Sequence, residues 1–166
     1  FGKVAGRRLV NTTIKKQIKM TLTQQHFQVA IVSCDERIAS CQARIDRWGP
    51  YHMMMKLAMG LYDTQEDKDV FDNPKGMEQI ANYENNMKLV KTEKMIYQAL
   101  LNNKTNKAIF PLLLAKYDEY MVESYELGEI LTQKGISPEQ EHIEFCKNSL
   151  TQRKYIKKCC DYGAKL

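Results

Sequence analysis

Apolar side chains recur every three or four residues over a long stretch near the start of the chain. From residue 31 onward the intervals alternate between three and four, through Ile31, Cys34, Ile38, Cys41, Ile45 and Trp48. This alternation is the heptad stripe of a helix that packs lengthwise against another helix. Since Thr12 or Thr13 can cap such a helix, we predict that it runs from about residue 12 to about residue 47.

This predicted helix is long for a chain of 166 residues. At 1.5 Å per residue, roughly 35 residues span about 50 Å, which exceeds the diameter of a compact domain of this size. A second apolar stripe lies on a partly different face and consists of Ile14, Ile18, Leu22, Val29 and Val32. We therefore expect the basic front part, from Lys3 to about Gln28, to project and reach a neighbour.

Turn and cap residues divide the middle of the chain. Gly49-Pro50 ends the first helix, because glycine accepts the left-handed cap and proline cannot continue a helix. A short Met-rich helix is predicted over 51–62, followed by an acidic loop over 63–72. Asn73-Pro74 then marks the start of a helix that runs to about Leu101.

The last third of the chain shows two more helices. After the polar break at 102–106, a helix starts in earnest at about Pro111, with Ile109, Leu113, Tyr120, Leu127 and Leu131 on one face. Lys134-Gly135 closes it. Ser137 is the predicted cap of the last helix, with Pro138 in its first turn and Gln140 completing a capping box. That helix reaches about Asp161, and Gly163 ends it.

These elements predict an all-α fold, an irregular bundle of four long helices plus one short helix, with the first helix partly projecting. Residues 1–11 show no period and form a predicted extended basic arm, and 12–166 a single helical domain. Composition agrees, with 43% apolar and 27% charged residues and few glycines and prolines. No strand pattern or internal repeat is visible.

Charge is segregated along the chain despite a net charge of only +5. Residues 1–47 hold nine basic and three acidic groups, and the tail from Lys147 holds six basic groups and one Asp. Residues 62–73 hold five acids and one Lys, and 116–144 hold eight acids and two Lys. Either neighbouring helices attract each other within one bundle, or the charged zones dock external partners.

Several residue patterns resemble binding or catalytic sites. Glu139 and His142 have the spacing of a di-iron helix ligand pair, but the second pair is missing around His26 and His52. His142 and Cys146 have the spacing of two zinc ligands or of a catalytic pair. Met53, Met54, Met55 and Met59 form a candidate copper cluster or adaptable partner surface. We favour a first-turn charge near the helix dipole for Glu139 and a packing role for the other sets, and we expect no catalytic residue, cofactor or metal.

The basic arm and tail offer contacts to anionic lipid headgroups, to an acidic neighbouring subunit or, less favoured, to RNA. Cys159-Cys160 beside Lys157-Lys158 resembles a palmitoylated pair, although packing on the core is the favoured role. The five cysteines have no disulfide or zinc spacing, so we expect reduced, mostly buried thiols. No segment is predicted to cross a membrane.

The first residue, Phe1, together with the basic stretch without acids up to Asp35, suits the region after a removed transit peptide or a truncation. We expect a non-catalytic subunit of a larger assembly, on the matrix side or periphery of the mitochondrial inner membrane, in a respiratory complex or ATP synthase. Ala164-Lys165-Leu166 resembles a peroxisomal signal, which leaves peroxisomal or cytoplasmic locations as alternatives. The functional alternatives are a free-standing helical adaptor that binds a partner helix or peptide, and a small helical metal-binding protein or enzyme.

Overall fold

The structure, a computed structural model, describes residues 24–46, 75–102 and 104–166. These contain a helix over 24–46, called the 24–46 helix below, and helices α4 (Lys75–Leu101), α5 (Ile109–Gln133) and α6 (Glu139–Lys165). No strand occurs within these ranges, so the all-α bundle is confirmed for them. The predicted arm over 1–11, the helix over 51–62, the acidic loop and the projection of the first helix fall outside the described residues.

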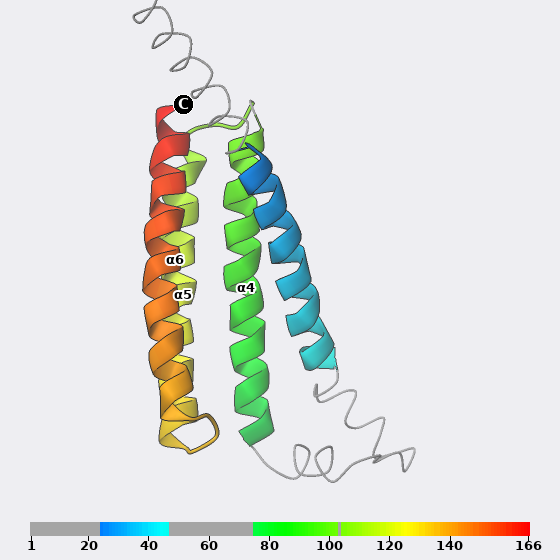
Figure 1. The fold of residues 1–166 in the computed structure, drawn as a ribbon, viewed down its shortest axis with the longest axis vertical. Coiled ribbons are helices and arrows are strands. Elements are labelled where there is room, and N and C mark those ends of the chain that lie inside the picture. The colour runs from blue at the N-terminus through cyan, green and yellow to red at the C-terminus, as the bar shows by residue number, and fades with distance from the viewer. Residues whose placement is uncertain (1–23, 47–74, 103) are drawn as a thin grey trace, which may run out of the picture.

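The four described helices lie side by side with alternating directions (Figure 1). The 24–46 helix runs down the view, α4 runs up, α5 down and α6 up again. Short connections account for the antiparallel packing of α4, α5 and α6, since helices joined by a few residues pack as antiparallel neighbours. Helix α5 contacts both α4 and α6 extensively, and the 24–46 helix lies along α4.

The seam predicted for the first helix packs against the rest of the bundle as expected. Cys34 is fully buried, and Ile31, Ile38, Cys41 and Ile45 are half-buried. Trp48 falls outside the described residues. The structure extends the seam by one step to Phe27, which is buried and stacks on Tyr97 of α4 at 6.0 Å between ring centroids.

The second stripe of that helix faces solvent where it is described. Val29 is 67% exposed and Val32 is 56% exposed. A helix of this amphipathicity can bury only one face, and the heptad seam takes it. The two valines therefore belong to the outer face of the bundle.

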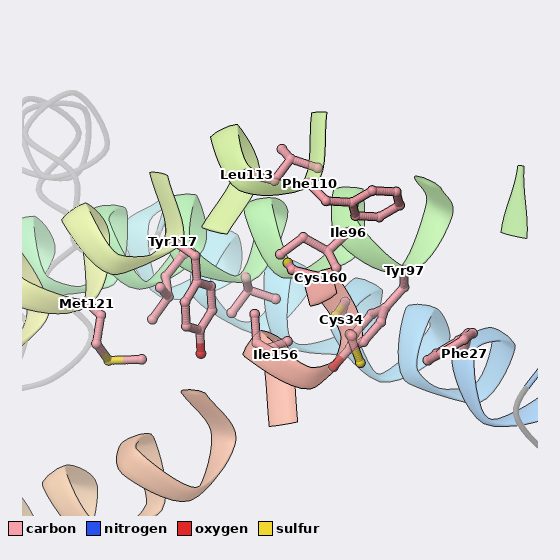
Figure 2. Packing of buried hydrophobic residues seen from close by; sticks show 13 residues of the cluster. Phe27, Cys34, Ile96, Tyr97, Phe110, Leu113, Tyr117, Met121, Ile156 and Cys160 are labelled. Carbon is pink, nitrogen blue, oxygen red and sulfur yellow. The ribbon is translucent and has the colours of Figure 1, made fainter. Parts of the chain in front are cut away.

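The core lies where the four helices meet and is mainly aromatic and aliphatic (Figure 2). Ile96 and Tyr97 of α4, Tyr117 of α5 and Ile156 of α6 are almost wholly inaccessible to solvent. Burying each such side chain stabilises the fold by roughly 1.5–3 kcal/mol. Cys159 and Cys160 also lie in this core, at 4% and 2% exposure, as the favoured packing role predicted.

Helix α5 buries a face that the sequence analysis identified only in part. Leu113 and Leu131 are buried as predicted, but Tyr120 and Leu127 are only half-buried. The buried seam runs instead through Phe110, Leu113, Tyr117, Met121, Ser124 and Leu131. The predicted stripe followed the most aliphatic residues, whereas the real one follows the aromatic rings that α4 and α6 enclose. The helix also begins at Ile109, ahead of Pro111.

The turn between α5 and α6 confirms one predicted signal and contradicts another. Gly135 has φ of +69°, a left-handed conformation that favours glycine, and it follows the last helical turn as predicted. The predicted capping box is wrong. Pro138 occupies the cap position without a side-chain hydrogen bond, and the backbone N–H of Ser137 instead donates to the carbonyl of Leu131 at 3.2 Å.

The predicted end of α6 at Gly163 is also wrong, because the helix continues to Lys165. Gly163 is buried against the ring of Phe110 from α5. A Cβ atom at this position would lie only 2.4 Å from Cζ of that ring. The glycine is therefore required for close approach of two helices rather than for a turn, a distinction that its position in the sequence does not reveal.

Opposite charges link neighbouring helices across the bundle. Arg153 of α6 donates two hydrogen bonds of 3.0 Å to Asp118 of α5, and Lys94 of α4 lies 2.6 Å from Asp35 of the 24–46 helix. Lys134, just after α5, pairs with Glu78 of α4. Part of the charge segregation along the chain thus serves attraction within the bundle, one of the two roles left open above.

Candidate functional site

A groove of about 450 Å³ opens between the 24–46 helix and α6. One wall consists of residues of the 24–46 helix at successive turns, namely Arg37, Ser40, Cys41 and Arg44. The opposite wall consists of α6 residues with the same spacing, namely Phe145, Asn148, Ser149 and Gln152. This volume falls in the range of roughly 300–1,000 Å³ that is usual for ligand-binding clefts. We refer to this feature as the groove.

The floor of the groove comes from the other two helices. It is mostly apolar, with the side chains of Leu89 and Val90 from α4 and of Tyr117 and Met121 from α5. Asn86 and Glu93 are the polar residues of the floor. All four described helices therefore build the groove, and its shape depends on the packing of the whole bundle.

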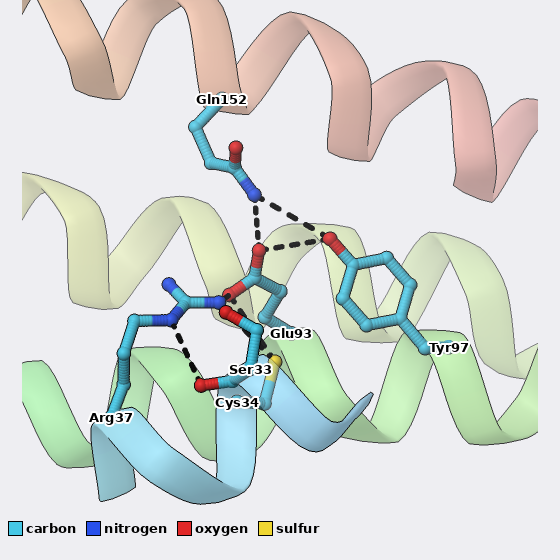
Figure 3. Close-up of polar contacts among 6 residues, drawn as sticks. All are labelled: Ser33, Cys34, Arg37, Glu93, Tyr97 and Gln152. Atoms are coloured by element: carbon cyan, nitrogen blue, oxygen red, sulfur yellow. Dashed lines mark hydrogen bonds and ion pairs between the residues drawn. The ribbon is translucent and has the colours of Figure 1, made fainter. Parts of the chain in front are cut away.

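Glu93 is the centre of a polar cluster at one end of the groove (Figure 3). Its side chain is 3% exposed, and it accepts a hydrogen bond of 2.7 Å from Arg37 Nη2 on the 24–46 helix. The Tyr97 hydroxyl donates to Glu93 at 2.9 Å, and Gln152 of α6 also donates to this carboxylate. The Cys34 thiol donates to it at 3.6 Å. We call these five residues the Glu93 cluster.

The Glu93 cluster ties three helices together through one carboxylate. The donors come from the 24–46 helix, from α4 itself and from α6, so no single helix satisfies the buried charge. A buried carboxylate is tolerated only with such partners, because an unpaired one costs several kcal/mol. Correct packing of the 24–46 helix and α6 is thus required to keep Glu93 satisfied.

The titratable partners of Glu93 stay in their hydrogen-bonding forms. Burial, reinforced by the negative charge of Glu93, raises the pKa of the Cys34 thiol to about 12. The same two causes raise the pKa of Tyr97 well above its ordinary value. Burial alone would lower the pKa of Arg37, but the charge of Glu93 outweighs it and the pKa is raised. The cluster is thus a set of donors around one carboxylate, and Cys34 is no thiolate nucleophile at neutral pH.

A second buried polar cluster joins α4 to α5 near the groove. Asn85 Nδ2 donates to Ser124 Oγ at 2.7 Å and to the Tyr120 carbonyl at 2.9 Å. Ser124 Oγ in turn donates to Asn86 Oδ1 at 3.1 Å. These bonds fix the position of Asn86, which lines the groove. The sequence analysis did not identify Glu93, Asn85 or Ser124, since a single buried polar residue has no pattern of its own.

The residues singled out as possible metal or catalytic groups lie elsewhere. His142 packs against Gly128 of α5, and the Cys146 sulfur lies 3.8 Å from His142 Nε2. Glu139 is exposed at the start of α6. Within residues 24–46, 75–102 and 104–166, no three His, Cys, Asp or Glu side chains lie close enough together to hold a metal ion. Met53, Met54, Met55 and Met59 fall outside the described residues.

The thiols differ in accessibility. Cys34, Cys159 and Cys160 are buried, while Cys41 and Cys146 are half-buried, and all five are free. The burial of the Cys159-Cys160 pair in the core contradicts its use as a membrane-facing palmitoylation site in this fold. The neighbouring Lys157 and Lys158 side chains are exposed.

No helix in the described part of the chain is both long and apolar enough to cross a bilayer. No protein-family model, curated protein or solved structure matches the chain at a significant level. The groove and the Glu93 cluster are therefore the features on which a functional proposal rests.

Proposed function

We propose that this chain is a non-catalytic helical subunit of a larger assembly and that it holds a segment of a partner protein in the groove. The observation that carries this proposal is the construction of the groove from all four described helices. A binding cleft of about 450 Å³ with a mostly apolar floor suits contacts to side chains. Its polar residues are mainly amides, hydroxyls and arginines, which suit recognition.

The chemistry of the lining supports binding over catalysis. Acid–base or nucleophilic catalysis needs a titratable group held near neutrality or an activated nucleophile. The carboxylate of Glu93 is instead occupied by donors from three helices, and the pKa of Cys34 is raised to about 12 by burial and by the negative charge of Glu93. These groups hold the bundle together around the groove.

The assembly that we favour is an energy-converting complex of the mitochondrial inner membrane, such as a respiratory complex or ATP synthase. The basic net charge, the free thiols and the basic stretch at 1–47 support this location. Other protein subunits are the proposed partners, and the exposed Lys157 and Lys158 add a possible contact to anionic lipids. The rival function, a free-standing helical adaptor, would use the same groove without a permanent assembly.

Blue-native electrophoresis of source membranes, probed for this chain, tests the assembly. We expect the chain to migrate only in a high-mass band, and migration at its own 19.3 kDa alone would overturn the proposal. Size exclusion of the purified chain separates the rival function, since an adaptor should elute as a well-behaved monomer.

A photo-crosslinking amino acid at Ser40 tests the groove itself. Ser40 is exposed and lines the groove, so we expect one discrete crosslinked product with a partner subunit. The matched control carries the same amino acid at Ala43, which is exposed on the same helix but does not line the groove. Equal crosslinking at the two positions would contradict binding in the groove.

A further inference from the structure

The groove has the repeat of a surface that receives a helix. The lining residues of α4 are Asn86, Leu89, Val90 and Glu93, which have offsets of zero, three, four and seven. The walls repeat this pattern over 37–44 and over 145–152. Residues at these offsets share one face over two helical turns, or about 11 Å along the helix. The groove therefore runs parallel to the bundle axis for two turns.

The apolar side chains of the groove floor lie deep, whereas the arginine on the wall reaches toward the rim. Leu89, Val90, Tyr117 and Met121 are each less than 10% exposed, whereas Arg37 has a side chain that is 46% exposed. An occupant must therefore place apolar side chains inward and polar ones outward along the same two turns. An amphipathic helix has this division of faces.

The rim on the side of the 24–46 helix is cationic. Arg37 and Arg44 lie seven residues apart on this wall, and the guanidinium of Arg44 lies 5.1 Å from the centre of the Tyr83 ring. Among the lining residues that the structure describes, Glu93 is the single carboxylate, and it is buried and already accepts bonds from Arg37, Tyr97 and Gln152. Because Arg37 already pairs with Glu93, the exposed Arg44 gives the described wall its positive charge, and an acidic occupant complements it.

Resting on the function proposed above, we propose that the partner segment is an amphipathic helix with an acidic edge. Its apolar side chains fill the space above Leu89, Val90 and Met121. Its carboxylates lie along the wall that carries Arg37 and Arg44. Steering by these arginines predicts that binding weakens with rising salt.

Two synthetic 18-residue helical peptides with the same leucine face test this proposal on the full chain. One peptide carries Glu along the edge of its apolar face and the other carries Lys there. We expect fluorescence anisotropy to show about tenfold tighter binding of the Glu peptide at low salt. Equal binding of the two peptides would refute the acidic edge. If the chain binds the fatty acid dodecanoate but neither peptide, the groove holds an acyl chain, and a helical occupant is refuted.

Variants place the peptide in the groove. Arg44→Glu should weaken the Glu peptide about tenfold and favour the Lys peptide, because the exposed guanidinium is replaced by a carboxylate. Ser40→Trp should weaken both peptides by filling the groove from its wall, while Ala43→Trp on the outer face should change neither. Unchanged binding in both Arg44→Glu and Ser40→Trp would place the peptide elsewhere and overturn the proposal.

The outcome is separable from that of the proposed function. If the chain migrates in a high-mass assembly but binds the two peptides equally, the subunit role stands and the acidic helical occupant is refuted. A chain that migrates alone yet binds the Glu peptide through Arg44 supports the acidic helix and removes the assembly.

Discussion

The ion pair between Glu93 and Arg37 predicts that replacing the arginine lowers the free energy of unfolding more than replacing the glutamate does. Glu93→Gln keeps the side-chain volume and leaves one oxygen to accept from Tyr97 and Gln152. It replaces the charged oxygen opposite Arg37, at 2.7 Å, with a donor. The loss of one charge-assisted hydrogen bond costs about 1.5–3 kcal/mol. Because the Arg37 side chain is 46% exposed and can regain water, we expect about 2 kcal/mol.

Arg37→Met should cost more, although Arg37 is the more exposed partner. Methionine keeps the aliphatic packing of the arginine stem but leaves the carboxylate of Glu93, 3% exposed, without a cation. Stranding a buried charge costs roughly 3–5 kcal/mol, and the remaining donors Tyr97 and Gln152 reduce this to about 3 kcal/mol. The double variant removes the stranded charge and should cost less than the sum of the two single variants.

Urea denaturation at pH 7, followed by far-UV circular dichroism, measures all four members of this cycle. The reasoning is refuted if Arg37→Met costs less than Glu93→Gln. It is equally refuted if the two changes add to within about 0.5 kcal/mol, because independent sites behave in that way. Lys116→Met is the control, since Lys116 is exposed and pairs with its helical neighbour Glu119 on the surface, so the change should alter stability little.

Three further predictions concern glycine positions and buried thiols. Gly163→Ala should lower the thermal midpoint measured by calorimetry, because the added Cβ overpacks the Phe110 ring at a cost of about 1–3 kcal/mol. Gly128→Ala should be close to neutral in the same measurement, because its added Cβ meets the movable end of His142. Gly135→Ala should cost about 1 kcal/mol in urea titration, since alanine is strained at φ of +69°; an unchanged midpoint would contradict that backbone. Burial raises the pKa of the Cys34 and Cys160 thiols from 9.0 to about 12. The unfolded chain therefore loses these thiol protons at lower pH than the folded chain does, and the free energy of unfolding should fall as pH rises from about 9 to about 12. Denaturation at stepped pH checks this, and an alkaline slope equal to that of a Cys34→Ala variant would contradict it.

The sequence predicted the helices and one of their packing faces from spacing alone. The heptad seam through Cys34 was correct because apolar residues at a fixed interval have few alternative uses. The face of α5 was predicted less well, since Tyr117 and Tyr120 are the same residue type and tertiary contacts decide which one is buried. Gly135 and Gly163 show the same limit, for one ends a helix and the other lies inside one.

The groove and the Glu93 cluster could not be predicted from the sequence. Glu93 lies one turn after Leu89 and Val90 on α4, but this spacing does not identify its donors Arg37 and Gln152, which are 56 and 59 residues away. Only the packed arrangement of three helices shows that its charge is buried. A groove likewise depends on how far two helices diverge, which no local pattern encodes.

The two glycines at the α5–α6 contact have a mechanical consequence. Phe110 of α5 fits the gap at Gly163 of α6, and His142 of α6 lies against Gly128 of α5. These contacts lie near opposite ends of the antiparallel pair, about 27 Å apart along α5. Sliding one helix past the other by a turn would drive the Phe110 ring into backbone that has no gap for it and would separate His142 from Gly128. These contacts thus hold the α5–α6 hairpin in one register.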